Sequence, residues 1–174
     1  DPFEFNITRY ESRYEERRPF FTQGSEVFMA SGGERNSGFY QPLELFYSRR
    51  IGQRLPGGGE VPLRLGGRAF GRAGAWEYGG FLAATDGAAY RDGSGWSEPE
   101  AQYSVARLRR GLLGNSSIGL LGAAKHGGSA DNGVLDVDGA LRGPDWQLAY
   151  QVARSWRERA NGGTAASAGF KLTR

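Results

Sequence analysis

The sequence has no cysteine, only two lysines and no apolar run long enough for a membrane-spanning helix. The lack of cysteine excludes disulfides and zinc sites that are built on thiolates. A spanning helix needs about 20 consecutive apolar residues, and the longest uncharged apolar stretch here, Ile118–Ala124, is much shorter. With a mean hydropathy of -0.55, the chain is not a helical membrane protein. Membrane strands are not excluded, because a spanning strand needs only about 10 residues with every second one apolar.

Lysine is almost entirely replaced by arginine. Only Lys125 and Lys171 are lysines among the 22 basic residues, and the formal net charge is +3. Arginine binds carboxylates in a forked geometry and stacks on aromatic rings. The bias has two interpretations of similar weight, a GC-rich genome or arginines that face a lumen or anionic headgroups. Nucleic-acid binding is not expected, because the arginines are spread among carboxylates and form no dense patch.

The character of the sequence changes near residue 42. Residues 1–42 are irregular, aromatic and charged, and Pro19 would interrupt any β-ladder there. This composition predicts an irregular N-terminal segment that is either plug-like or forms first strands. Residues 43–174 form short alternating runs separated by glycine-rich turns, and the chain contains 29 glycines. We therefore predict antiparallel β-barrel strands for residues 43–174.

About eight strands are predicted in this second region. The candidate strands are Leu43–Arg50, Val61–Arg72, Ala75–Thr85, Ala101–Leu112, Ser116–His126, Gly133–Arg142, Trp146–Trp156 and Thr164–Leu172. Most are longer than the globular norm of about 5 to 6 residues, and their length matches a membrane. The connections alternate between tight and longer ones. This order is typical of an up-and-down outer-membrane barrel with short turns on the periplasmic side.

Apolar and polar side chains alternate with a period of two in several of these runs, which favours strands over helices. One face carries apolar residues that include Leu63, Leu65, Leu135, Val137, Leu148 and Tyr150. The opposite face carries Arg64, Arg68, Asp136, Asp138, Gln147 and Gln151. The run Ala101–Leu112 fits less well, because Arg107 follows apolar residues on one face. We therefore expect a bulge or an early strand end there.

Three tryptophans lie at predicted strand ends, namely Trp76, Trp146 and Trp156. Aromatic side chains at these positions are typical of the girdles at membrane interfaces. The alternative is that they cap the core of a soluble β-protein. Trp96 falls in the longest predicted connection, and we expect it to anchor that loop.

Two segments carry a specific resemblance to a known family. Residues Arg18–Phe21 read Arg-Pro-Phe-Phe, and residues Phe46–Gly52 read Phe-Tyr-Ser-Arg-Arg-Ile-Gly. Together with Phe5–Glu11, they form an ordered series that resembles an uncharacterised outer-membrane β-barrel domain of Gram-negative bacteria. That domain typically follows a family-nine carbohydrate-binding module. The resemblance covers nearly the whole chain and implies a bacterial outer-membrane location, contact with lipid and a link to carbohydrate.

Two features depart from the family pattern. The sugar-binding module is absent from the sequence, and family members carry more barrel strands than fit here. The chain also begins at Asp1 without a signal peptide. We therefore expect a mature or partial segment, which is either part of a larger barrel or a shortened relative. The family implies no established reaction.

Several charged residues are candidates for a site. Arg49 and Arg50 would point to opposite faces of a strand, one toward a lumen and the other toward headgroups, or they belong to an internal arginine–carboxylate ladder that braces the barrel. Asp136 and Asp138 share a strand face, and paired carboxylates can hydrolyse glycosides. We favour a polar lumen wall, because nothing nearby suggests the raised pKa that an acid catalyst needs. His126 has no clustered partners, so a metal site is not expected there.

The sequence thus predicts an all-β fold, an antiparallel up-and-down transmembrane β-barrel or part of a larger one, with an irregular aromatic N-terminal segment. The predicted function is that of an outer-membrane pore or surface anchor linked to carbohydrate binding or uptake, with no catalytic residue, metal or cofactor. The residues expected to line the lumen or a ligand site are Arg49, Arg50, Arg64, Arg68, Asp136, Asp138, Gln147 and Gln151. The alternative is a soluble all-β binding or structural protein, lectin-like or filament-forming. The expected partners are outer-membrane lipid and carbohydrate, and the oligomeric state stays open.

Overall fold

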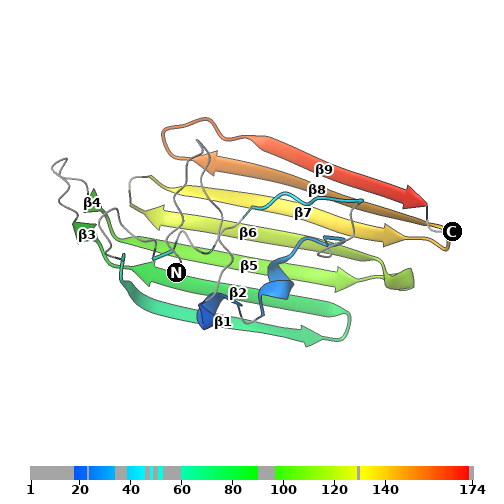
Figure 1. The fold of residues 1–174 in the computed structure, drawn as a ribbon, viewed down its shortest axis with the longest axis horizontal. Coiled ribbons are helices and arrows are strands. Elements are labelled where there is room, and N and C mark those ends of the chain that lie inside the picture. The colour runs from blue at the N-terminus through cyan, green and yellow to red at the C-terminus, as the bar shows by residue number, and fades with distance from the viewer. Residues whose placement is uncertain are drawn as a thin grey trace, which may run out of the picture.

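The computed structural model describes residues 18–22, 24–33, 39–45, 48, 51–52, 60–89, 97–128 and 130–172. Within these residues, the chain forms mainly one antiparallel sheet in sequence order, called the main sheet below (Figure 1). Its strands are β1 (Leu63–Ala73), β2 (Trp76–Thr85), β5 (Ala101–Gly111), β6 (Ser117–Gly127), β7 (Asn132–Arg142), β8 (Trp146–Arg157) and β9 (Thr164–Leu172). Two short strands, β3 (Ala88–Ala89) and β4 (Ser97–Glu98), pair with each other outside it. The predicted all-β, antiparallel, up-and-down architecture is confirmed.

The main sheet is open. Among the described strands, β1 pairs with β2 alone and β9 pairs with β8 alone. Within the described residues the sheet is therefore not closed into a barrel, and β1 and β9 are its two edges.

Short connections join β1 to β2 and β5 to β6 in the main sheet. β1 and β2 are linked by Gly74 and Ala75, and Gly74 has a φ of 58°. Glycine at the first central position of a two-residue loop is the arrangement of a type II′ turn, which matches the twist of the strands. β5 and β6 are linked through a 3₁₀ turn, η3 (Leu113–Asn115), in which Asn115 has a φ of 57°. Asparagine is among the residues that tolerate this left-handed conformation.

The structure confirms the predicted strands except the first. Leu43–Leu45 is not a strand, Ser48 lies in a 3₁₀ turn, and the rest of the predicted strand Leu43–Arg50 lies outside the described residues. The reason is a side chain: Gln151 accepts a hydrogen bond from the Leu43 N–H at 2.7 Å and donates one to the Leu43 C=O at 3.3 Å. Both backbone groups of Leu43 are thus satisfied without a neighbouring strand.

The expectation of a bulge in the run Ala101–Leu112 was wrong. β5 pairs with β2 and with β6 over its full length without a register shift. Arg107 keeps the alternation of the strand and lies on the inner face, where it is buried and paired with a carboxylate, as described below. The register irregularity lies at the start of β1, between Leu63 and Leu65.

The main sheet has two faces of opposite character. The inner face, which the described part of residues 18–45 covers, holds buried polar side chains that include Arg107, Asp136, Asp138 and Gln151. The outer face holds large apolar side chains that are exposed, with Leu65 at 69% and Leu82 at 66%. Charged side chains are thus buried on the covered face, and large apolar side chains are exposed on the other. Soluble domains normally show the opposite arrangement.

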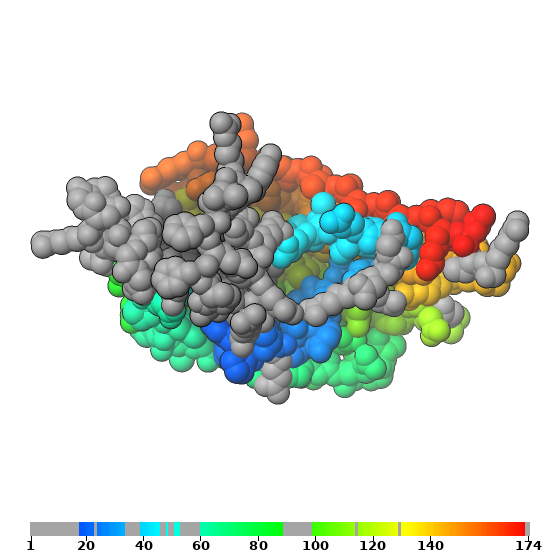
Figure 2. All heavy atoms as spheres, viewed as in Figure 1, coloured from blue at the N-terminus to red at the C-terminus, as the bar shows by residue number. Residues whose placement is uncertain are grey.

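The covering segment, by which we mean the described part of residues 18–45, lies across the inner face. Figure 1 and Figure 2 show its blue and cyan parts in front of the strands. It contains a short helix, α1 (Pro19–Thr22), and a 3₁₀ helix, η1 (Ser25–Phe28). In the described part of the chain, no helix has the length and apolar character that crossing a membrane requires.

Glycines on the inner face permit the close approach of the covering segment. A Cβ atom at Gly66 would lie 2.8 Å from the Phe20 ring, and a Cβ atom at Gly79 would lie 2.7 Å from Val27 Cγ1. Both distances are shorter than van der Waals contact, so any larger residue at these positions would displace the segment. The glycines therefore shape the inner face to fit what covers it.

A small hydrophobic core joins the covering segment to the sheet. Its buried members are Ile51, Phe81, Ala83 and Val105. The rings of Phe21 and Phe28 meet the Phe81 ring edge-on, with centroid distances of 5.7 Å and 5.8 Å. Such edge-to-face pairs contribute about 0.5–1.5 kcal/mol beyond the burial of their area. The core thus anchors one end of the covering segment, while polar contacts hold the rest.

Candidate functional site

A buried ion cluster lies on the inner face of the middle strands, formed by Arg107 of β5 with Asp136 and Asp138 of β7. The three side chains are at most 1% exposed. Arg107 Nη2 donates to Asp138 Oδ1 at 2.8 Å, and Nη1 donates to Asp138 Oδ2. Asp136 Oδ2 lies 3.9 Å from Nη1. Two carboxylates therefore share one guanidinium, and the pair with Asp138 has the forked geometry of the strongest ion pairs.

Arg107 reaches Asp138 by passing over the intervening strand β6. In the register of the sheet, Arg107 is opposite Leu121, and Asp138 is opposite Gly119. A Cβ atom at Gly119 would lie 2.6 Å from Arg107 Nη2. The missing side chain at Gly119 is therefore what allows the guanidinium to cross from β5 to β7.

The buried ion cluster also binds the covering segment. The Ser31 N–H donates to Asp138 Oδ1 at 2.8 Å, and Arg107 Nη2 donates to the Met29 C=O at 3.2 Å. Within the described residues, Ser31 Oγ, Arg107 Nε and Asp136 Oδ1 are buried without a hydrogen-bond partner. Unsatisfied buried polar atoms cost free energy, which offsets part of the stabilisation from the paired groups of the cluster.

Gln151 of β8 stands opposite Asp138 in the register and holds a second part of the covering segment. Besides its two bonds to the backbone at residue 43, it accepts a hydrogen bond from Tyr40 Oη at 3.5 Å. Burial raises the pKa of Tyr40 to about 12, with smaller contributions from the negative charges of Asp138 and Asp136. The phenol therefore stays protonated at neutral pH and serves as a donor.

One cross-strand row of inner-face residues is polar on nearly every strand, and we call it the polar row. From β1 to β9 it consists of Arg72, Glu77, Arg109, Gly119, Asp138, Gln151 and Ser167. Glu77 Oε2 accepts from Arg72 Nη2 at 2.9 Å and from Arg109 Nη2 at 2.7 Å. At the opposite end, Ser167 Oγ donates to the Gln41 C=O at 2.8 Å. The polar row thus forms a belt of charged and hydrogen-bonding groups across the inner face.

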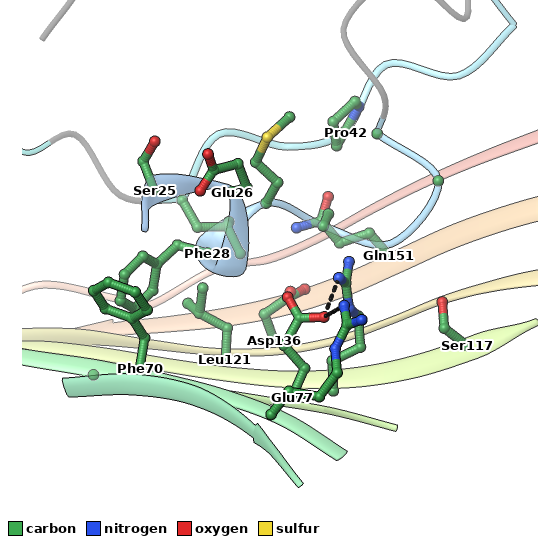
Figure 3. Close-up of a pocket in the computed structure, with 18 of the residues that line it drawn as sticks. Ser25, Glu26, Phe28, Pro42, Phe70, Glu77, Ser117, Leu121, Asp136 and Gln151 are labelled. Carbon is green, nitrogen blue, oxygen red and sulfur yellow. Dashed lines mark hydrogen bonds and ion pairs between the residues drawn. The ribbon is translucent and has the colours of Figure 1, made fainter. Parts of the chain in front are cut away.

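A cavity of about 1290 Å3 lies between the covering segment and the inner face. Figure 3 shows side chains of the sheet below it and of the covering segment above it, among them Asp136, Gln151, Glu26 and Phe28. Glu77, held by its two arginines, also lines the cavity, and five phenylalanines line it in all. Charged groups of both signs beside aromatic rings suit a polar ligand that also has an apolar surface.

The structure brings three of the predicted lumen residues together. Asp136, Asp138 and Gln151 are buried side by side on β7 and β8. Gln147 shares their face, but it lies at the turn end of β8, where it is opposite Arg142 and Lys171. The predicted site residues Arg49 and Arg50 lie outside the described residues.

The two predicted arginines of β1 have separate partners. Arg64 Nη1 lies 3.7 Å from a carboxylate oxygen of Asp86 and 3.7 Å from one of Glu100. Arg68 Nη1 donates to two carbonyls of α1, at 3.0 Å and 2.7 Å. Arg64 therefore belongs to the rim of the sheet, whereas Arg68 supports the covering segment.

Three functional side chains were missed in the sequence, namely Arg107, Glu77 and Arg109. The alternation of side-chain direction along a strand would have found them, because each residue occupies an inner-face position of its strand. In the sequence Arg107 interrupts an apolar run, a pattern from which a bulge or an early strand end was expected. Its partner lies two strands away, at Asp138, a relation that alternation within one strand does not reveal.

His126 lies at the rim of the sheet. Its Nδ1 is 3.2 Å from Asp131 Oδ2, and the Gly127 N–H donates to Asp131 Oδ1 at 2.8 Å. This backbone hydrogen bond, together with the one to His126, holds the pKa of Asp131 below its ordinary value. Among the described residues, no group of three or more His, Cys, Asp or Glu side chains is arranged to hold a metal ion.

Comparison with known proteins reaches the N-terminal part of the chain. A family model described as a Domain of unknown function (DUF5916) matches residues 1–62. No curated protein and no solved structure matches the chain. The matched region includes the covering segment and ends just before β1. The likeness to an uncharacterised domain therefore lies in the N-terminal part of the chain, which includes the covering segment.

Proposed function

We propose that the main sheet is a section of the wall of a β-barrel in a bacterial outer membrane, with the covering segment inside the barrel. The observation that carries this proposal is the inverted sheet, which exposes large apolar side chains on its outer face and buries charges on its inner face. A barrel wall turns one side to lipid and the other to a polar lumen. In water, the same outer face would be a broad apolar patch that favours association.

The dimensions of the sheet support the proposal. The strands of the main sheet range from 9 residues in β9 to 12 in β8, and a tilted spanning strand needs about 9–11. Trp76 and Trp146 begin their strands, and Trp156 lies near the opposite end of β8. Aromatic girdles at both membrane interfaces have this distribution. The Arg110 guanidinium, 5.2 Å from the centre of the Trp76 ring, is placed for contact with headgroups.

The proposed role is that of a pore or surface anchor that binds or passes carbohydrate, without a catalytic step. The cavity beside Asp136 and Gln151 supports a polar ligand, because carboxylates, amides and guanidinium groups supply acceptors and donors for hydroxyl groups. The link to carbohydrate comes from the family resemblance of the N-terminal motifs. Isothermal titration of the folded protein with neutral and acidic oligosaccharides tests this role, and the absence of binding by both classes would remove it.

The membrane location is tested by refolding the purified chain in buffer, in detergent micelles and with lipid vesicles. We expect β-structure by circular dichroism in micelles and vesicles, and flotation of the protein with the vesicles after a high-salt wash. In buffer alone we expect association, because the outer face has no apolar surroundings there. A monodisperse folded species in buffer that does not float with vesicles would contradict the proposal.

A soluble all-β binding or structural protein, lectin-like or filament-forming, is the competing function. The observation that favours it is the pair of open edges, β1 and β9, in the described sheet, because unpaired edges template the addition of further strands. Ordered filaments in electron micrographs of a detergent-free sample would support this function over the membrane barrel.

A further inference from the structure

The outer face of the main sheet carries a hollow of about 690 Å3, which we call the outer groove. This volume lies in the range of roughly 300–1,000 Å3 that is usual for small-molecule sites. The floor of the outer groove is one cross-strand row of small residues on four neighbouring strands, namely Ala69, Gly80, Ala106 and Gly122. Larger side chains of the same face also line it, namely Tyr78, Leu82, Leu135 and Trp156. The outer groove is therefore almost wholly apolar.

The floor is hollow because the outer side chains around it are large. On β2, Tyr78 and Leu82 flank Gly80, and both are exposed. At the β7 end of the floor, Leu135 stands opposite Gly122 and is exposed as well. The outer groove thus opens on the face of the sheet and not along an edge, so strands that extend the sheet would leave it open.

An arginine ends the row that forms the floor. In the register, Gly122 is followed by Leu135 on β7 and by Arg154 on β8. Arg154 is exposed, and within the described residues its side chain has no hydrogen bond or ion pair. It is two residues from Trp156, near the end of β8. On the lipid side of a barrel, an arginine costs free energy unless it reaches the headgroups, where a phosphate can bind it.

We propose that the outer groove binds an acyl chain of an anionic membrane lipid, with the lipid phosphate at Arg154. The small residues of the floor let the chain approach the backbone of the sheet closely. A basic residue near the membrane surface attracts lipids of net negative charge, and Arg154 has no carboxylate partner among the described residues that would neutralise it. This inference rests on the proposed barrel wall and names the class of lipid that the wall binds and the position where it binds.

Quenching of Trp156 fluorescence by brominated lipid tests the proposal, because Trp156 lines the outer groove. The protein is the full chain with the substitutions Trp76→Phe, Trp96→Phe and Trp146→Phe, which leave one tryptophan, refolded into phosphatidylcholine vesicles. One sample contains a minor fraction of phosphatidylglycerol that is brominated in the middle of its acyl chains. The other contains the same fraction of equally brominated phosphatidylcholine.

We expect the relative binding constant of the brominated phosphatidylglycerol to be about fivefold higher, since one basic residue near the surface favours anionic lipid by about that factor. Arg154→Gln should abolish this preference. The matched control Arg110→Gln should keep it, because Arg110 stands opposite residue 76 at the other end of the strands. Ala106→Phe fills the floor and should also abolish the preference, whereas Ala73→Phe, on the outer face but outside the outer groove, should keep it.

Flotation of the same samples with the vesicles separates the two proposals. Equal quenching by the two lipids in samples that float would overturn the lipid site and leave the barrel wall standing. A preference that survives either Arg154→Gln or Ala106→Phe would have the same consequence, because the charge or the hollow would then be irrelevant to it. Protein that does not float would overturn both.

Discussion

On the inner face of the main sheet, Arg107, Asp136 and Asp138 are buried, whereas on the outer face Leu135 and Val137 of the same strand β7 are exposed. Buried charges are tolerated only when they are paired and hydrogen-bonded. Apolar surface that stays exposed to water lacks the stabilisation of roughly 25 cal/mol per Å2 that its burial would contribute. Alternate residues of β7 therefore lie in two different environments. The comparison teaches that the two faces are built for different surroundings, which is the physical basis of the proposed membrane location.

Glycine is used differently on the two faces. On the inner face, Gly79 admits Val27 of the covering segment. On the outer face, aromatic rings lie over glycines of the neighbouring strand, as Tyr78 lies over Gly71, and the pairs Gly133 with Trp156 and Gly139 with Tyr150 repeat the arrangement. An aromatic ring over a cross-strand glycine pins the register of a sheet. Gly79 therefore makes room for a distant segment, whereas Gly71, Gly133 and Gly139 are covered by rings of the sheet itself.

Arg107→Leu on the inner face is expected to cause the largest loss in the free energy of unfolding. It leaves Asp136 and Asp138 buried without a cation, which costs about 3–5 kcal/mol of the free energy of unfolding. Urea unfolding of the protein in micelles, followed by tryptophan fluorescence, measures the loss. The double variant Arg107→Leu with Asp138→Leu removes both partners of the closer pair, so part of the loss should be recovered while Asp136 stays buried without a cation. A double variant as unstable as the single one would show that the ion pair is not what Arg107 contributes.

Leu135→Arg on the outer face is expected to cause a somewhat smaller loss in the free energy of unfolding. A cation on the lipid side of a barrel strand costs about 2–4 kcal/mol near the middle of the bilayer. Unfolding from lipid vesicles measures it. Leu113→Arg is the matched control, because Leu113 is 96% exposed in the η3 turn, and no loss is expected there. If Leu135→Arg were neutral in vesicles and improved solubility without detergent, the outer face would be a water-facing surface.

The faces of the strands were predictable from the sequence because burial repeats with the two-residue period of a strand. The alternation of Leu135 and Val137 with Asp136 and Asp138 gave the orientation of β7 without any tertiary information. The expected strand at Leu43–Arg50 failed for the converse reason. Its alternation resembles a strand, but the partner of the Leu43 backbone is the side chain of Gln151, and pattern alone does not distinguish the two.

The buried ion cluster was only half predictable. Asp136 and Asp138 were recognised as inner residues, but their cation was not. The contact depends on three strands, with Arg107 on β5, its partner on β7 and a glycine on β6 between them. Sequence patterns within a strand carry no information on which glycine lies under which side chain. The register of both hairpins is needed before Gly119 is recognised as the passage for the guanidinium.

The substitution Gly119→Ala tests the difference between the inner and outer faces within a single strand, β6. Its Cβ atom would lie 2.6 Å from Arg107 Nη2, so the guanidinium must move, and we expect a loss of about 1–3 kcal/mol. Gly122→Ala on the outer face of the same strand is the control, because its Cβ atom would meet Leu135 at 3.4 Å, an ordinary contact. Its effect should stay within about 0.5 kcal/mol. Equal losses in micelles would mean that strand propensity, not the passage of Arg107, governs β6.

The substitution Gln151→Leu has the smallest expected effect on global stability and the most local one. It removes the side chain that binds both backbone groups of Leu43, a loss of about 0.5–1.5 kcal/mol for each hydrogen bond. Because Phe81 and Arg107 still hold the earlier part of the covering segment, we expect residues 39–45 to loosen while the strands keep their protection. Hydrogen exchange by mass spectrometry measures this difference between segment and sheet.

Gln147→Leu is the matched control for that experiment, since Gln147 lies on the same strand and face but stands opposite Arg142 and Lys171. It should leave the exchange of residues 39–45 unchanged. If Gln151→Leu accelerated exchange in β8 and β9 as much as in residues 39–45, the covering segment would be an integral layer of the sheet. A selective loss at residues 39–45 would instead show that this part is fastened to the inner face by few contacts and is separable from the strands beneath it.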